Sequence, residues 1–286
     1  MDYQQIFRRK EQKYRVPAEE LPALMKILQQ YFRPDIYYEG TNCSLYYDTP
    51  DHRLITDSME KPAFRQKLRM RSYGTSEREQ PVFIELKKKY SGITYKRRES
   101  LSLAEAEALL KGDWRPEGRT RTLDEIIWFL DQYDLEPSMF IAYDRLSYRG
   151  IDAPELRATI DRNIRYRTAD LFLGAGSSGH LLDLGGDAIM ELKTNRALPM
   201  GLVRSLKRLG VFPGSFSKYE ACYTQEQRAR KTNRDRTADA GRKLSDMSGS
   251  IWKEYQRFAA DYTIRHGGHM PEQGAAFQSL DPAGSI

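Results

Sequence analysis

The amino-acid sequence predicts an α+β fold whose main element is a β-barrel closed around a charged interior. Eight segments alternate in polarity with a period of two residues, which is the pattern of β-strands. Helical patterns fall between them without regular β-α-β alternation, and this favours a mostly antiparallel sheet over a doubly wound one. The polar side of several strands combines Arg, Lys and Glu with Tyr, Phe and Ile, a mixture that suits a half-enclosed cavity better than open solvent.

The strand segments are each bounded by turn residues. Polar and apolar side chains alternate in these segments, and in several of them the polar face is expected to be charged. The predicted strands cover roughly residues 6–16, 42–49, 66–73, 81–89, 93–101, 139–149, 155–164 and 187–194.

Helix signals lie between the strands. Ser102 and Glu105 form a capping box at the start of one predicted helix. Thr122 and Glu125 repeat this spacing before a second apolar stripe. Stripes rich in leucine predict two further helices, over residues 18–32 and 198–209.

The apolar pattern is lost after about residue 224. We therefore expect one domain over residues 1–224 and a charged extension over residues 225–286. Within the extension, residues 250–264 have the pattern of a short amphipathic helix, and the last residues have the composition of a disordered end.

The overall composition and charge limit the kinds of protein that this chain can be. Of the 286 residues, 40% are hydrophobic and 30% are charged, and the net charge is +6. This is typical of a soluble globular protein, and the basic excess indicates an anionic partner. Cys43 and Cys222 belong to no CxxC pair, so neither a zinc ribbon nor a disulfide framework is expected. The polar first residues and the lack of a long apolar run favour a cytoplasmic location, with recruitment to a membrane by another protein left open.

The charged strand faces carry the functional prediction. In residues 66–73, Lys67, Arg69 and Arg71 share one face, and in residues 81–89 Glu85 and Lys87 lie opposite an apolar face. The same alternation places further charged residues on strand faces, namely Arg9, Glu11, Lys13, Arg145, Arg157, Glu191 and Lys193.

Closing the sheet with these faces inside would bring many like charges within ~10 Å of one another. A ligand with dense negative charge along its length relieves that repulsion. Arg offers bidentate contacts to phosphate oxygens and Lys offers point charges, while a few carboxylates suit a hard cation that bridges phosphates. The pattern therefore predicts a binding site for a phosphate chain.

The chain resembles the VTC domain family, the polyphosphate polymerase branch of the triphosphate tunnel metalloenzymes, which is related to the CYTH domains. The resemblance runs from about Phe7 to Tyr223. It implies an eight-stranded antiparallel closed tunnel with flanking helices that takes the γ-phosphate of ATP and extends an inorganic polyphosphate chain. The segments that carry it are RKEQKY at 9–14, LYYDTPD at 45–51, KLRMRSYG at 67–74, VFIELKKK at 82–89, TYKRRESL at 94–101, IAYDRLSY at 141–148, LRATIDRNIRYR at 156–167, MELK at 190–193 and FSKY at 216–219.

The resemblance also implies roles for individual residues, which agree with the charged strand faces. Glu191 would hold a divalent metal, Mn²⁺ or Mg²⁺, with Glu85 and Glu11 as supports. The catalytic contacts to phosphate would come from Lys13, Arg69, Arg71, Lys87, Arg145, Arg157 and Lys218. Further phosphate contacts would come from Arg9, Lys67, Lys96, Arg98, Lys193 and Ser217.

Three positions depart from the family pattern. Arg9 stands where the hydrolytic relatives have the first Glu of an ExExK motif, which favours a single-metal transferase over a two-metal hydrolase. Ser215 stands where a lysine is expected, and a family arginine aligns with either Lys61 or Arg65. Two alternatives stay open: a triphosphatase of the same fold that cleaves inorganic or nucleoside triphosphate, and a non-catalytic module that binds polyphosphate. Nucleic acid is not an expected partner.

Overall fold

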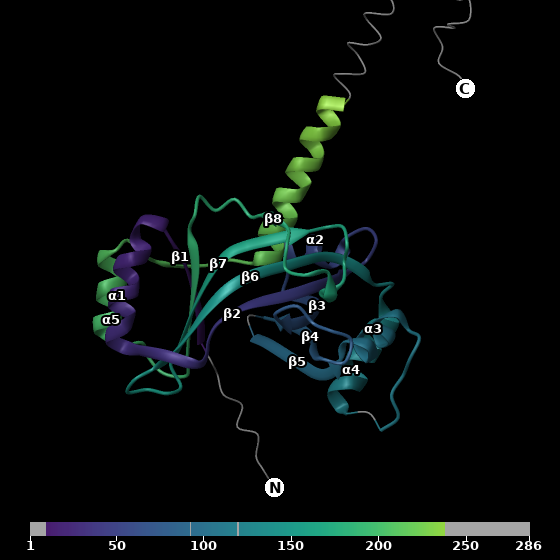
Figure 1. Cartoon of the computed structure of the whole chain (residues 1–286), viewed down its shortest axis with the longest axis horizontal. Helices are drawn as coiled ribbons and strands as arrows, with labels where there is room; N and C mark the ends of the chain where they lie inside the picture. Colours follow the sequence, from purple (N-terminus) through teal and green to yellow (C-terminus); the bar gives the residue numbers. More distant parts are fainter. Residues whose placement is uncertain (1–9, 92, 119, 238–286) are drawn as a thin grey trace, which may run out of the picture. The chain divides into compact units, whose positions relative to one another are not determined.

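The computed structural model describes residues 10–91, 93–118 and 120–237 (Figure 1). The chain divides into two compact units, residues 1–225 and 226–286. The first unit contains a large sheet with helices, and the described part of the second, residues 226–237, is helical. The helix predicted over residues 250–264 and the predicted disordered end lie outside the described residues.

The sheet confirms the predicted α+β class with antiparallel strands. Each predicted segment contains a strand, and every strand pairing is antiparallel. The strands are β1 (Lys10–Val16), β2 (Phe32–Asp48), β3 (Phe64–Tyr73), β4 (Pro81–Tyr90), β5 (Ile93–Ser102), β6 (Glu136–Gly150), β7 (Arg157–Arg167), β8 (His180–Leu181), β9 (Ala188–Thr194) and β10 (Pro213–Gly214).

The sheet is open rather than closed, so the predicted closed barrel is not confirmed. Its ten strands follow the order β10-β1-β9-β7-β6-β2-β3-β4-β5, with β8 paired to β7. Within the described part of the chain, β5 at one end of the sheet pairs only with β4. At the other end, the two residues of β10 pair with Lys13 and Tyr14 of β1. Among the strands that the structure describes, no hydrogen-bonded ladder therefore joins the two ends of the sheet.

Helices cover the apolar face of the sheet in two pairs (Figure 1). The helices α1 and α5 cover one end, and α3 and α4 cover the other. None of the helices in the described ranges combines the length and the apolar character that crossing a membrane requires. The helical elements of the first unit are η1 (Ala18–Glu20), α1 (Leu21–Tyr31), α2 (Arg53–Met59), α3 (Leu103–Lys111), α4 (Arg121–Gln132), η2 (Leu173–Ala175) and α5 (Met200–Arg208), and residues 218–225 are helical as well.

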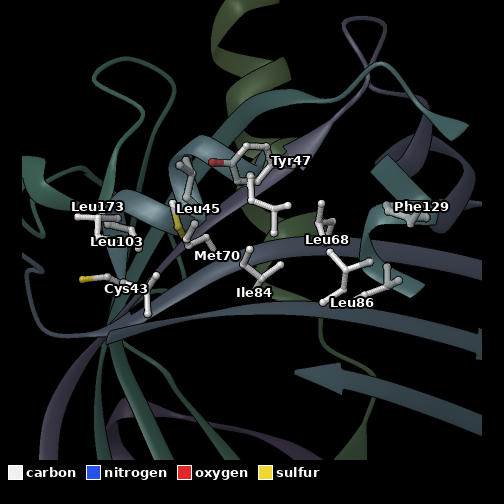
Figure 2. Close-up of a cluster of buried hydrophobic side chains, with 14 of the residues drawn as sticks. Cys43, Leu45, Tyr47, Leu68, Met70, Ile84, Leu86, Leu103, Phe129 and Leu173 are labelled. Atoms are coloured by element: carbon white, nitrogen blue, oxygen red, sulfur yellow. The ribbon is translucent and has the colours of Figure 1, made fainter. Parts of the chain in front are cut away.

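One core lies between β2, β3 and β4 and the pair α3 and α4. Leu68 and Met70 of β3 and Ile84 and Leu86 of β4 are fully buried together with Phe129 of α4 (Figure 2). Each such side chain contributes roughly 1.5–3 kcal/mol to folding. These residues alternate with the charged ones along the strands, so burying them fixes which face the charges occupy.

A second core lies under α1 and α5. Leu24 and Leu28 of α1 and Leu202 and Leu206 of α5 pack against the apolar side of β1, β6, β7 and β9, where Met190 is fully buried. The two cores bury one side of the eight longer strands beneath these helices. A third, smaller cluster lies on the opposite face and includes Ile141 of β6, Ile189 of β9 and Tyr219.

The predicted helix starts are confirmed in one case and wrong in the other. Ser102 caps α3, since its hydroxyl accepts from the amide of Glu105 at 3.2 Å and its own amide donates to the Glu105 carboxylate at 2.9 Å. The cap of α4 is Thr120, not Thr122, and it accepts from the amide of Leu123 at 3.1 Å. Glu125 makes no cap because it forms ion pairs with cations of β4 and β5.

Candidate phosphate-binding site

The face of the sheet opposite the four covering helices, here called the inner face, carries the charged residues predicted from the sequence. Strand register sets them side by side: Arg69 lies opposite Glu85, and Glu85 lies opposite Arg98. On the other half of the sheet, Lys13 lies opposite Glu191. The full set on this face is Glu11, Lys13, Lys67, Arg69, Arg71, Glu85, Lys87, Lys96, Arg98, Arg145, Arg157, Glu191 and Lys193.

One group of cations surrounds Glu85, whose side chain is fully buried. Arg69, Lys96 and Arg98 each approach its carboxylate to 2.6 Å. Burial alone would raise the pKa of Glu85, but Arg69, Arg71 and the other cations hold it well below its usual range. Both carboxylate oxygens are occupied by cations, so the role of Glu85 in this structure is to hold basic side chains in place.

Two neighbouring lysines differ in their pairing. Lys67 donates to the Glu220 carboxylate at 2.9 Å and to the Ser217 hydroxyl at 3.2 Å. Lys87 lies directly opposite Lys67 and is only partly exposed. Burial, together with repulsion from Arg69, lowers the pKa of Lys87 to about 7. At neutral pH, this amine is therefore poised between its charged and neutral forms.

A second group of cations surrounds Glu191, which is buried. Lys193 lies at 3.2 Å, Lys218 at 3.7 Å, and Lys13 and Arg145 at 3.8 Å from its carboxylate. Burial would raise the pKa of Glu191, but Lys218 and the other cations hold it well below its usual range. Three of these four ion pairs are longer than an ordinary hydrogen bond, so the Glu191 oxygens are held mainly by longer-range attraction.

Asp161 completes this second group and was not predicted. Its buried carboxylate accepts from the Arg145 guanidinium at 2.6 Å and 2.7 Å and from Lys218 at 2.5 Å. Asp161 thereby fixes two cations that also face Glu191. The period-two alternation from Arg157 through Thr159 to Asp161 is the signal that could have identified it.

Tyr143 of β6 lies between the two groups. Arg71 donates to its hydroxyl at 3.0 Å, while the Lys218 ammonium lies 4.5 Å and the Arg145 guanidinium 5.2 Å from the ring centroid. Cations from β3, from β6 and from the residues after β10 therefore meet around one aromatic ring.

The segment that follows β10 crosses the inner face and partly encloses it. Lys13 of β1 donates to the carbonyl of Phe216 at 2.8 Å. Three residues later, Tyr219 stacks on Tyr46 of β2 with ring centroids 4.3 Å apart. This crossing brings Ser217 and Lys218 over the sheet, at the start of the helical residues 218–237.

Some predicted positions lie apart from these groups. Arg157 is exposed and forms an ion pair with Asp35. Arg65 lies on the inner face two residues before Lys67, whereas Lys61 lies outside the strand. Ser215 is exposed, and Arg9 lies outside the described residues.

The carboxylates fit a metal only in part. Across the described ranges, no group of three or more His, Cys, Asp or Glu side chains could hold a metal ion by itself. Glu191 and Glu11 share Lys13 and Lys193 as partners at 3.2–3.8 Å. Since Mg²⁺ is usually bound by one or two carboxylates plus substrate phosphates, Glu191 fits a site that phosphate oxygens would complete.

Comparison with known proteins identifies the family. The sequence pattern of the VTC domain matches residues 8–226, and the chain belongs to this family. No curated protein matches significantly.

Solved structures that match the chain include a candidate adenylate cyclase from Bacillus halodurans, with 16% identity, a TM-score of 0.44, and coverage of 72% of this chain and 92% of that one. A candidate adenylyl cyclase from Hippeastrum, described with a dominant triphosphatase activity, has 16% identity, a TM-score of 0.44, and coverage of 75% and 95%. A protein from Pyrococcus horikoshii has 13% identity, a TM-score of 0.40, and coverage of 76% and 99%. These distant likenesses carry no weight for the activity of this chain.

Proposed function

We propose that this protein is a metal-dependent phosphotransferase that transfers the γ-phosphate of ATP to a growing inorganic polyphosphate chain. The observation that carries the proposal is the convergence of cations on the inner face. Arg71, Arg145 and Lys218 come from three separate parts of the chain and meet around the Tyr143 ring. Among the described residues, the carboxylates in the two groups are fewer than the cations around them, which leaves positive charge for an anionic ligand.

We assign the phosphate contacts closest to the chemistry to the cations around Glu191. Arg145 is held in a bidentate pair by Asp161, so its guanidinium is oriented before a ligand arrives. Burial would lower the pKa of Lys218, but Asp161, Tyr143 and Glu191 raise it, which keeps the ammonium charged. Groups fixed in this way stabilise charge that develops on a transferred phosphoryl group without having to reorganise.

We assign a second set of contacts to the cations around Glu85. Arg69 and Arg71 are anchored by Glu85, Tyr46, Ser44 and Tyr143, and they would bind phosphates already joined to the chain. The same role falls to Lys67, Lys87, Lys96 and Arg98.

Glu191 is the residue that would hold a divalent metal, with Glu11, which shares Lys13 and Lys193 with it, as support. A bound Mn²⁺ or Mg²⁺ would neutralise charge on the phosphate oxygens. The attacking group would be a terminal phosphate oxygen of the chain, which is already anionic and needs no general base; it forms a bond to the γ-phosphorus as the bond to the β-phosphate breaks and ADP leaves. The work of the protein is therefore to position two phosphate groups and to screen their repulsion.

Incubation with ATP and Mn²⁺ or Mg²⁺, with the products resolved on a gel, tests this proposal. The proposal predicts phosphate polymers from the native protein and none from Glu191→Gln, which removes the negative charge while keeping the shape of the side chain. Release of free phosphate alone would instead support a triphosphatase. Tight polyphosphate binding without ATP turnover under either metal would support a non-catalytic binding module.

The proposed partners are ATP and inorganic polyphosphate, and nucleic acid is not among them. A cytoplasmic location, where ATP is available, is part of the same proposal.

A further inference from the structure

A groove lies on the helix-covered face of the sheet, beside α5. It is lined by side chains of β1, β9 and α5 and by residues 196–198 and 211–213. Its volume is about 430 Å³, within the range of about 300–1,000 Å³ that is typical of ligand-binding clefts. Since its strand residues belong to the core under α1 and α5, the groove is on the opposite side of the sheet from the two groups of cations.

The apolar lining of the groove is partly open to solvent. Val203 of α5 is 41% exposed and Phe212 is 59% exposed, whereas Leu206 and Val211, which also line the groove, are buried. Large apolar side chains exposed beside a concave surface are typical of interaction sites. The groove can therefore take an apolar side chain from a partner.

The charged residues of the groove are all basic. They are Lys10, Arg196 and Lys207. Arg196 pairs with Glu155 at 3.3 Å, but within the described ranges neither lysine has an ion-pair partner. The sequence from residue 192 to residue 219 contains six Lys and Arg residues and no Asp or Glu, so this part of the chain provides no compensating carboxylate. An occupant of the groove is therefore expected to carry negative charge.

The backbone of β1 provides a second feature at the same place. β10 pairs with β1 only at Lys13 and Tyr14. The chain then turns onto the inner face, where the carbonyl of Phe216 accepts from Lys13 at 2.8 Å. Among the described strands, residues 10–12 of β1 therefore pair with β9 alone. Two of these three residues line the groove, so a free strand edge borders it.

We propose that the groove docks an extended acidic segment of a partner protein, which adds a strand to the free edge of β1. Backbone pairing along residues 10–12 supplies affinity, and an apolar side chain inserted between Val203 and Phe212 supplies specificity. Carboxylates on either side of this apolar anchor pair with Lys10 and Lys207. A protein segment fits better than a membrane surface, because the site is concave and because only a peptide backbone can complete a strand edge. This docking site does not depend on the proposed function.

Selection from a library of random short peptides displayed on phage tests the assignment with the full chain. The selected peptides are expected to be rich in Asp and Glu and to carry apolar residues at alternating positions. Fluorescence anisotropy gives their dissociation constants, and hydrogen exchange of residues 10–12 should slow when a peptide is bound. Selected peptides without an excess of acidic residues would overturn the proposal, and so would failure to select any peptide.

Matched variants separate the groove from the inner face, which also attracts anions. Val203→Glu places a carboxylate in the groove and should weaken binding of the selected peptides at least about tenfold. Met200→Glu makes the same change on α5 outside the groove lining and should have little effect. Lys207→Gln should weaken binding about two- to fivefold, whereas Lys96→Gln on the inner face should leave it unchanged.

The outcomes identify the occupant. Peptide binding that survives Val203→Glu but is lost in Lys96→Gln would place the peptides on the inner face and overturn the proposal. Vesicles containing an anionic phospholipid that bind through Val203, with no peptide bound, would assign the groove to a lipid surface and overturn it as well. Because Lys207 is exposed, Lys207→Gln keeps the test valid if Val203→Glu fails to unfold cooperatively in urea. Loss of ATP turnover would contradict the proposed function without affecting the docking site.

Discussion

If the inner face binds phosphate as proposed, Lys87 should couple that binding to the uptake of a proton. In the ligand-free protein, its pKa is about 7, because the amine is largely buried and lies near Arg69. A phosphate chain on the inner face supplies negative charge that opposes this repulsion, and the pKa should return toward the ordinary value for lysine of about 10.4. The complex then favours the charged amine, whereas the free protein at pH 8 favours the neutral one.

The size of the effect follows from linkage between proton and ligand binding. If the pKa of Lys87 returns to about 10.4 in the complex, the affinity for the phosphate chain should fall about tenfold between pH 6 and pH 8. It should fall about tenfold more by pH 9. The direction is fixed, because below pH 7 the amine is already charged before binding and no proton has to be taken up. Proton uptake should be about half a proton at pH 7 and about 0.9 at pH 8.

Calorimetry of tripolyphosphate binding in two buffers with different ionisation enthalpies measures this uptake directly. The ligand also ionises in this range, so a matched variant is needed. Lys87→Arg keeps the positive charge at every pH, and the difference between it and the native protein isolates Lys87. Equal proton uptake by the two proteins at pH 8 would refute the reasoning.

Three further predictions concern stability. Asp161→Asn removes the carboxylate that pairs with Arg145 and Lys218, and it should lower the free energy of unfolding, measured by urea titration, by about 3–5 kcal/mol. The control Asp57→Asn removes the exposed pair with Arg53 and should change this free energy by less than about 1 kcal/mol. Thr120→Ala should cost about 1 kcal/mol and Thr122→Ala clearly less, and the opposite order would show that the cap is misassigned. The pKa of Glu85 is held far below its ordinary value, so its stabilisation is complete above about pH 4.5 and is lost as the pH falls further. Unfolding of Glu85→Gln should therefore depend less on pH between 6 and 3 than unfolding of the native protein, and parallel curves would contradict this.

The strands and their charged faces could be predicted because period-two alternation is a local property. Leu68, Met70, Ile84 and Leu86 alternate with charged residues in the sequence, and burial of the apolar set leaves the charged set on one face. The capping box at Ser102 was predictable for the same reason, since it depends only on residues three apart.

Features that depend on distant contacts were not predictable. Lys218 was placed from the family resemblance, but its partner Asp161 lies 57 positions earlier in the chain and comes close only through the crossing of the segment after β10. The short helix α2 was missed because its stabilising contacts are remote: the buried Asp48 carboxylate accepts from the amides of Leu54 and Ile55 and from the hydroxyl of Tyr219. Closure of the sheet was likewise not decided by alternation, because that pattern describes faces and not edges.

A crystal structure of the protein with tripolyphosphate tests the central claim most directly. The account predicts phosphate groups on the inner face, within hydrogen-bonding distance of Arg145, Lys218 and Arg69. Phosphate bound only on the helix-covered side of the sheet, with these three side chains still paired as they are in the ligand-free protein, would contradict it.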